Sequence, residues 1–299
     1  MKLRKFSLVC LLFIAVFVSC NKDDNSKTDT EEVRDRAEQE IADQEALKEY
    51  LETHFYNYED FENPSVDFNY NIVFDTINGT NADKIPLIES DLLQTKTFTY
   101  EDVDYNIYIL KVREGEKNQP KFTDSTFVSY RGELLDQSIF DRSESPVWFD
   151  LVKLIPGFGQ AMTEFKGASG FEVNPDNSVT FNNDFGVGAM FLPSGLAYFQ
   201  NGQIDIPQYS PVIFTFNLYG VNEADHDRDG IPSYMEDLND NKIISDDDTD
   251  GDGYPNYLDP DDDNDVIPTR EEIIINQDAS LEFPDKDNDG TPDYLDSDN

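Results

Sequence analysis

The stretch from Phe127 to Ser143 constrains the fold of this chain more than any other segment. Its first part, Phe127-Val-Ser-Tyr-Arg-Gly-Glu-Leu134, alternates apolar and polar side chains, and the stretch ends with a Phe-Asp pair before Arg142 and Ser143. Alternation of this kind predicts a β-strand with one buried face, and the break that follows it predicts a turn. We therefore expect a half-buried strand followed by a turn.

Further strands are predicted at Tyr105–Arg113, Val147–Leu151 and Val212–Leu218, with a short helix after Pro156. In this order the chain resembles the FKBP-type peptidyl-prolyl cis-trans isomerases. The motifs that carry the resemblance, besides the stretch above, are Pro146-Val-Trp-Phe-Asp-Leu151, Leu154-Ile-Pro-Gly-Phe158, Leu196-Ala-Tyr198, Ile206-Pro207 and Val212-Ile-Phe-Thr-Phe-Asn-Leu218. The resemblance covers residues 105–221. It implies an α+β fold in which a bent antiparallel sheet wraps around one short helix.

The resemblance also implies an enzyme that rotates X-Pro peptide bonds without a cofactor. Rotation faces a barrier of about 18–20 kcal/mol because the amide loses its resonance. A dry aromatic pocket favours the twisted, less polar amide, and each tenfold acceleration needs about 1.4 kcal/mol. The positions that match the family's catalytic residues are Tyr130, Phe140, Asp141, Ile155, Phe158, Tyr198 and Phe214. Those that match its substrate-binding residues are Val147, Leu154 and Ile206.

In the family, the residues that match Asp141 and Tyr198 make polar contacts at the pocket, and the backbone N–H that matches Ile155 donates to the ligand's carbonyl group. Several positions depart from the family's pattern: Phe158 replaces tryptophan, Val147 replaces phenylalanine, Arg142 interrupts a serine pair, Phe199 replaces glycine and Asp205 replaces an apolar residue. These departures leave a binding module without activity as an alternative to an isomerase.

The stretch from Thr163 to Gly195 is longer than the family's by about 15–20 residues. It contains Asn174-Pro-Asp-Asn177, which predicts a turn between Phe171–Val173 and Val179–Phe181. We expect an extra hairpin near the pocket.

The first residues of the sequence predict a targeting signal rather than part of the folded domain. Lys2, Arg4 and Lys5 precede an apolar run too short to remain as a membrane span, and Val18-Ser-Cys20 resembles a bacterial lipobox. We expect residues 1–19 to be a signal peptide, Cys20 to carry lipid, and residues 20–30 to be a tether. Asn21-Lys-Asp-Asp24 resembles the surface-export signal of lipoproteins from the Bacteroidetes group, so the outer membrane, with exposure at the cell surface as one option, is the expected location. An ordinary secretory signal is the alternative.

A helical segment is predicted at residues 31–57. Thr28 and Glu31 have the spacing of a capping box, and an apolar stripe of residues recurs at helical spacing: Val33, Ala37, Ile41, Leu47 and Leu51. The helix could pack beside the domain, space it from the membrane or pair with a second copy, and the single helix is favoured. Residues 58–104 carry no assignment.

Residues 222–299 form a strongly acidic segment in which the acids are regularly spaced. In three copies, Asp occupies positions 1, 3 and 5, Gly occupies position 6 and an acid occupies position 12, which is the spacing of calcium loops. The expected ligands are Asp225, Asp227, Asp229 and Glu236, then Asp248, Asp250, Asp252 and Asp259, then Asp285, Asp287, Asp289 and Asp296. Two weaker copies are Asp237, Asn239 and Asn241 closing on Asp248, and Asp261, Asp263 and Asp265 closing on Glu272.

Each strong copy has Pro at position 8 and Tyr at position 10: Pro232 and Tyr234, Pro255 and Tyr257, Pro292 and Tyr294. Proline at this position disfavours the second helix of an EF-hand. The pattern instead resembles thrombospondin type 3 repeats, which implies an irregular chain wrapped around structural calcium ions. A disordered acidic tail is the alternative.

The net charge of the chain and its scarcity of histidine and cysteine exclude two classes of function. A net charge of -41 excludes nucleic acid as a partner, because phosphates would be repelled. Two histidines, and no cysteine after Cys20, exclude an ordinary structural zinc site. The expected partners are polypeptides that contain X-Pro bonds, the membrane through the lipid anchor, and calcium. A calcium-dependent structural protein of the cell surface remains a further alternative.

Overall fold

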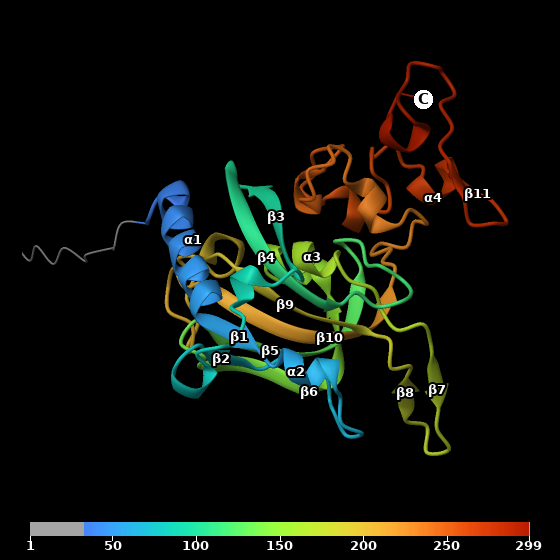
Figure 1. Cartoon of the computed structure of the whole chain (residues 1–299). Helices are drawn as coiled ribbons and strands as arrows, with labels where there is room; N and C mark the ends of the chain where they lie inside the picture. The colour runs from blue at the N-terminus through green and yellow to red at the C-terminus, as the bar shows by residue number, and fades with distance from the viewer. Residues whose placement is uncertain (1–32, 299) are drawn as a thin grey trace, which may run out of the picture. The chain divides into compact units, whose positions relative to one another are not determined.

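The computed structural model describes residues 33–298, and it confirms the α+β fold with an antiparallel sheet. The central sheet has six strands in the order β3-β4-β9-β10-β5-β6, and every neighbouring pair is antiparallel (Figure 1). The strands are β3 (Leu93–Tyr100), β4 (Val103–Arg113), β5 (Ser125–Leu134), β6 (Ile139–Asp150), β9 (Gly186–Leu192) and β10 (Val212–Asn222). The helices are α1 (Arg36–Thr53), α2 (Tyr58–Glu62), α3 (Pro156–Met162) and α4 (Thr269–Glu272).

The sheet buries both of its faces, because its inner strands are apolar on both sides. In β9, Met190 and Leu192 pack on the side of α3, whereas Ala189 and Phe191 pack on the side of α1. Side chains of a strand alternate between the two faces, so one short strand contributes to both cores. The short helix expected after Pro156 is α3, which has Pro at its first position and packs on one face.

The second face is covered by the predicted helix α1 and by parts of residues 58–104, which the sequence left unassigned. Leu47 and Leu51 of α1, Phe74 of β2 and Leu87 lie in one cluster with Phe191. Strand β1 (His54–Tyr56) pairs with β2 (Phe74–Thr76), and β3 forms the edge of the central sheet. The sheet therefore begins at residue 93, earlier than the expected boundary at residue 105.

Helix α1 differs from its expected limits and from its expected apolar stripe. It begins at Arg36 behind an Asp35 cap and ends at Thr53, inside the predicted range of 31–57. Val33, Ala37 and Ile41 are exposed, and the buried positions of the first half are instead polar: Gln39, Glu40, Asp43 and Gln44. The prediction of an apolar stripe was wrong there, because the surface beneath that half of α1 offers backbone hydrogen-bonding groups. The helix packs beside the domain.

The extra hairpin is confirmed as β7 (Phe171–Val173) paired with β8 (Val179–Phe181). Asn177 at the turn adopts a left-handed backbone with φ 64°, a conformation that asparagine tolerates better than most residues. The hairpin contacts Phe127 through Phe181. Phe127 points away from the α3 side of the sheet, so the hairpin does not lie at the expected pocket.

The acidic segment has little regular structure, as the proline positions predict. Its regular elements are the short helix α4, the two-stranded pair of β11 (Ile274–Ile275) and β12 (Leu281–Glu282), and several single turns of 3-10 helix. Its small apolar cluster is centred on Ile231, Ile273 and Tyr294. None of the helices within residues 33–298 combines the length and hydropathy that a membrane-spanning helix requires. The predicted signal, Cys20, the tether and the Thr28–Glu31 cap lie outside the described residues.

Candidate functional site

Five of the predicted pocket residues converge from four elements of the fold. Phe158 of α3 lies edge-on to Phe214 of β10 (ring centroids 5.3 Å apart, 86°), and Phe140 of β6 meets the same ring (5.5 Å, 85°). Tyr130 of β5 donates its hydroxyl hydrogen to Asp141 Oδ2 at 2.7 Å. The arrangement gives a packed aromatic group, in which Phe158 and Phe214 are buried, with one carboxylate at its edge.

A glycine explains why Phe140 can lie so close to Phe214. A Cβ atom on Gly132 would be 2.5 Å from Phe140 and 2.9 Å from Phe214, closer than side-chain atoms approach in proteins. Gly132 stands on β5 two residues after Tyr130, on the same face of the strand. Any larger residue there would displace both rings.

The Asp141 carboxylate is oriented by two donors. Its Oδ2 accepts from Tyr130, and its Oδ1 accepts from the backbone N–H of Arg142 at 2.8 Å. Burial, together with this bond, raises the pKa of the Tyr130 hydroxyl, and burial and the charge of Asp141 raise the pKa of Tyr198. Both phenols therefore stay protonated at neutral pH and remain hydrogen-bond donors.

The remaining predicted residues lie around these rings. Leu154, Ile155 and Tyr198 are half-buried against the same core, and Ile206 is fully part of it. Ile155 caps α3, and its carbonyl accepts from the Phe158 N–H at 3.0 Å. Val147 is half-buried and pairs with Val128. Asp205, one of the departures, is exposed.

One aromatic residue of the pocket was missed by the sequence analysis. Phe149 lies 4.9 Å from the Tyr130 ring and 5.9 Å from the Phe158 ring, so it links the two. It stands two residues after Val147 and therefore on the same face of β6. That spacing was the available signal. Phe149 supplies aromatic surface next to the position where Val147 replaces the family's phenylalanine.

The loop that carries Tyr198 and Ile206 is held by α1. Asp43 Oδ2 accepts from the backbone N–H and the hydroxyl of Ser194, at 2.7 and 2.6 Å. The Arg36 guanidinium lies 4.2 Å from the centroid of the Phe199 ring. Phe199 has a left-handed backbone (φ 42°) at the family's glycine position, a strained conformation for an aromatic residue. Contacts from α1 therefore support the strained turn beside Tyr198.

The acidic loops share one backbone conformation, which the regular spacing of their acids predicts. In each strong copy the fourth and sixth positions have positive φ: Arg228 and Gly230, Gly251 and Gly253, and Asn288 and Gly290. In the weaker copy that begins at Asp261, the fourth and sixth positions, Asn264 and Val266, also have positive φ. In these four copies the carboxylate at position 5 accepts from the N–H of position 7, at 2.6–2.7 Å.

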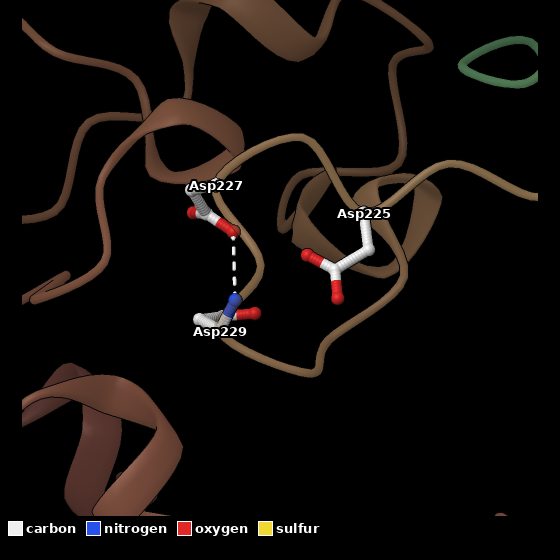
Figure 2. Close-up of side chains that lie close together, drawn as sticks. All are labelled: Asp225, Asp227 and Asp229. Carbon is white, nitrogen blue, oxygen red and sulfur yellow. Dashed lines mark hydrogen bonds between the residues drawn. The ribbon is translucent and has the colours of Figure 1, made fainter.

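This conformation gathers the predicted ligands. Oxygens of Asp225, Asp227 and Asp229 lie within 4.8 Å of one another, and Figure 2 shows the three side chains around one loop, with the Asp229 N–H donating to Asp227. Three other triplets gather in the same way: Asp248, Asp250 and Asp252; Asp261, Asp263 and Asp265; and Asp285, Asp287 and Asp289.

The predicted closing residues behave differently from one another. Glu236 gathers with Asp229, and the pKa of Asp259 is raised by burial and by the charges of Asp252 and Asp250. Asp296 accepts from the Asp298 N–H at 3.1 Å and is not part of the group formed by Asp285, Asp287 and Asp289 among the described residues. In the weaker copy that begins at Asp237, the Lys242 ammonium group lies 3.4 Å from the Asp237 carboxylate.

One acid in the segment was not predicted as a ligand. Asp262 gathers with Asp229 and Glu236, and all three are buried. Burial and the neighbouring carboxylates raise the pKa of Glu236 to about 10 and that of Asp262 to about 9. Because Asp262 lies between positions 1 and 3 of a weak copy, its spacing gave no signal.

The chain is similar in sequence to curated isomerases. It is 27% identical over 124 residues to a probable FKBP-type 25 kDa peptidyl-prolyl cis-trans isomerase of Pseudomonas aeruginosa, covering 41% of this chain and 47% of that protein. It is 30% identical over 118 residues to a probable FKBP-type isomerase, FkpA, of Neisseria meningitidis, covering 38% of this chain and 37% of that protein. The chain is homologous to FKBP-type isomerases. It spans less than half the length of either relative.

Solved structures and one family model also match parts of the chain. An isomerase from Pseudomonas syringae has 23% identity and a TM-score of 0.34, covering 45% of this chain and 84% of that one. FkpA from Escherichia coli has 24% identity and a TM-score of 0.34, covering 45% and 53%. A family model described as BamM C-terminal matches residues 226–284, which lie within the acidic segment.

Proposed function

We propose that this chain is an FKBP-type peptidyl-prolyl cis-trans isomerase that acts on extracytoplasmic polypeptides, is anchored through Cys20, and carries a calcium-binding C-terminal segment. The observation that supports the activity best is the convergence of Tyr130, Phe140, Asp141, Phe158 and Phe214 in one aromatic group. The sequence homology to FKBP-type isomerases supports the same activity.

The site would act by desolvation and by positioning. Phe158 and Phe214 form a dry floor on which a prolyl ring can rest, which favours the less polar twisted amide over the planar one. Tyr198, whose raised pKa keeps it a donor, stands near Asp141 at the edge. The N–H of Ile155, at the start of α3, is the proposed donor to the substrate carbonyl.

A protease-coupled assay on an X-Pro peptide tests the activity. Wild type should accelerate isomerisation, and Asp141→Ala should lower kcat/KM about tenfold, or about 1.4 kcal/mol, because Tyr130 and the pocket edge lose their anchor. Glu144→Ala is the matched control, since Glu144 is an exposed acid on the same strand. If the wild-type protein does not accelerate isomerisation, the proposed isomerase activity is wrong. Equal rates for Asp141→Ala and wild type would remove this pocket from the mechanism.

A binding module without activity is the second candidate, and the left-handed Phe199 beside Tyr198 favours it, because it reshapes the loop at the pocket. In that case a Pro-containing peptide would change the intrinsic fluorescence on titration, yet its isomerisation would not be accelerated. Loss of that binding in Asp141→Ala would assign it to the same pocket.

The anchor has its own test. Cys20→Ser should move the protein from the membrane fraction to the soluble fraction of the envelope, because it removes the acceptor for stable lipid attachment. Serine conserves the size of the side chain, and Cys10→Ser is the matched control. Unchanged membrane association of Cys20→Ser would contradict the lipoprotein assignment.

The calcium proposal is supported by the shared loop conformation and by oxygen-only ligand sets, which suit hard cations. The same property supports the alternative of a calcium-dependent structural protein, in which the segment would be the functional part.

A further inference from the structure

Three carboxylates from two separate parts of the acidic segment meet in a buried group. Asp229 and Glu236 belong to the first calcium-type loop, whereas Asp262 follows Pro260 in a later loop. Oxygens of the three side chains lie within 4.8 Å of one another. Oxygens that share one calcium ion at roughly 2.4 Å lie within about twice that distance of one another, and this group meets that condition.

The group is buried and its oxygens lack partners. Glu236 is 0% exposed, and Asp229 and Asp262 are each 2% exposed. Both carboxylate oxygens of Glu236 and of Asp262, and Oδ2 of Asp229, have no hydrogen-bond partner among the described residues. The other Asp229 oxygen accepts from the Ile231 N–H at 2.7 Å, which fixes the side chain. Buried charges in proteins are normally paired or bound to a metal ion.

The neighbouring groups hold the carboxylates without neutralising them. The Asp262 N–H donates to the hydroxyl of the buried Thr269 at 3.1 Å, which places the residue. Arg270 reaches the backbone carbonyl of Asp229 at 3.4 Å, and one guanidinium group cannot balance three carboxylates. Ile231, Ile273 and Tyr294 form a buried apolar cluster beside them.

We propose that Asp262 is a ligand of the divalent cation bound by the first loop, so that this ion ties residues 225–236 to residues 259–273. The proposal rests on calcium binding by the C-terminal segment and adds a ligand and a connection to it. The cation is a hard one such as calcium, since every side chain that faces it offers carboxylate oxygen. The segment has few apolar side chains, so the ion stabilises its folded form as an apolar core would.

Paired variants in the full chain test the connection. With calcium, Asp262→Asn should weaken one calcium site at least about tenfold in a calorimetric titration, because a ligand charge is lost. It should also speed amide hydrogen exchange in residues 225–236. Glu236→Gln should likewise speed exchange in the other segment, residues 259–273. Glu271→Gln is the control, because it removes the same charge from an exposed position of α4.

When a chelator removes calcium, Asp262→Asn is expected to have the opposite effect on hydrogen exchange. Without an ion, buried Asp262 must either stay ionised beside other carboxylates or take up a proton, and both cost free energy. Asp262→Asn removes that cost, so exchange in both segments should slow relative to wild type. If wild type binds calcium but each variant affects only its own segment, the connection is overturned while calcium binding stands. If wild type binds no calcium, both proposals fall. Unchanged exchange in β9 shows that a variant retains the folded sheet.

Discussion

Removing calcium from the full chain is expected to open residues 225–298 to proteolysis while the six-stranded sheet stays folded. The five loop copies contain many carboxylates, and the apolar cluster of the segment is small. Without cations the like charges repel, and burial of an unpaired carboxylate costs several kcal/mol. When the calcium concentration is 100 times the dissociation constant of a site, binding at that site stabilises the closed segment by about 2.7 kcal/mol. Each bound ion therefore suppresses opening about a hundredfold.

A lysine-specific protease gives the measurement. Lys242 and Lys286 lie in the acidic segment, and Lys96 and Lys111 lie in strands β3 and β4 as internal controls. Mass spectrometry should show rapid cleavage at the first pair in chelator, slow cleavage in millimolar calcium, and recovery of protection when calcium is added back. Equal cleavage of the first pair in both conditions would contradict calcium binding by the segment.

The acidic segment also contacts the six-stranded domain, so loss of its order can affect the stability of that domain. His226 Nε2 lies 3.3 Å from Asp150 Oδ1 at the end of β6, and the Ala224 N–H donates to Asp124 Oδ1 at 3.2 Å. Lys242 lies 5.7 Å from the centroid of the Phe122 ring, and Ile243 packs against the core that holds Phe158. Cleavage within the segment should therefore lower the unfolding temperature of the sheet slightly.

The sequence predicted well those parts of the fold in which local pattern and burial agree. The alternation in residues 127–134 became β5, and Asn174–Asn177 became the turn of the β7–β8 hairpin. The acid–glycine spacing matches loops of one conformation, because the positions that need positive φ carry mostly Gly or Asn. In each case, neighbours in sequence determine the conformation.

The parts that could not be predicted depend on contacts between distant segments. Gln39 and Asp43 looked like the solvent face of α1, yet they are buried because Ser194 and Tyr209 offer hydrogen-bonding groups there. Asp262 looked like one more acid in an acidic run, yet it lies against Glu236. Polarity alone could not identify these positions, because their burial is decided by the partner surface.

Asp43→Ala is expected to destabilise the folded domain by about 2–4 kcal/mol. Asp43 is 2% exposed, and it accepts from the N–H and hydroxyl of Ser194 and from the Gln39 amide at 2.7 Å. Alanine would leave these buried donors without an acceptor, at about 1–3 kcal/mol each, partly offset because the charge of Asp43 is no longer desolvated. Burial indeed raises the pKa of Asp43 against the opposing bonds from Ser194.

Denaturant unfolding and kinetics of the proposed isomerase activity should separate two roles of Asp43. Asp43→Asn keeps one acceptor for Ser194 and should recover at least half of the lost stability. Ser194 also accepts from the Phe199 N–H at 2.9 Å, so loosening it should displace Tyr198 and raise KM more than it lowers kcat. Glu45→Ala, an exposed acid of α1, is the control. Because α1 reaches the loop through this pair, wild-type stability in Asp43→Ala would show that the helix does not support the pocket.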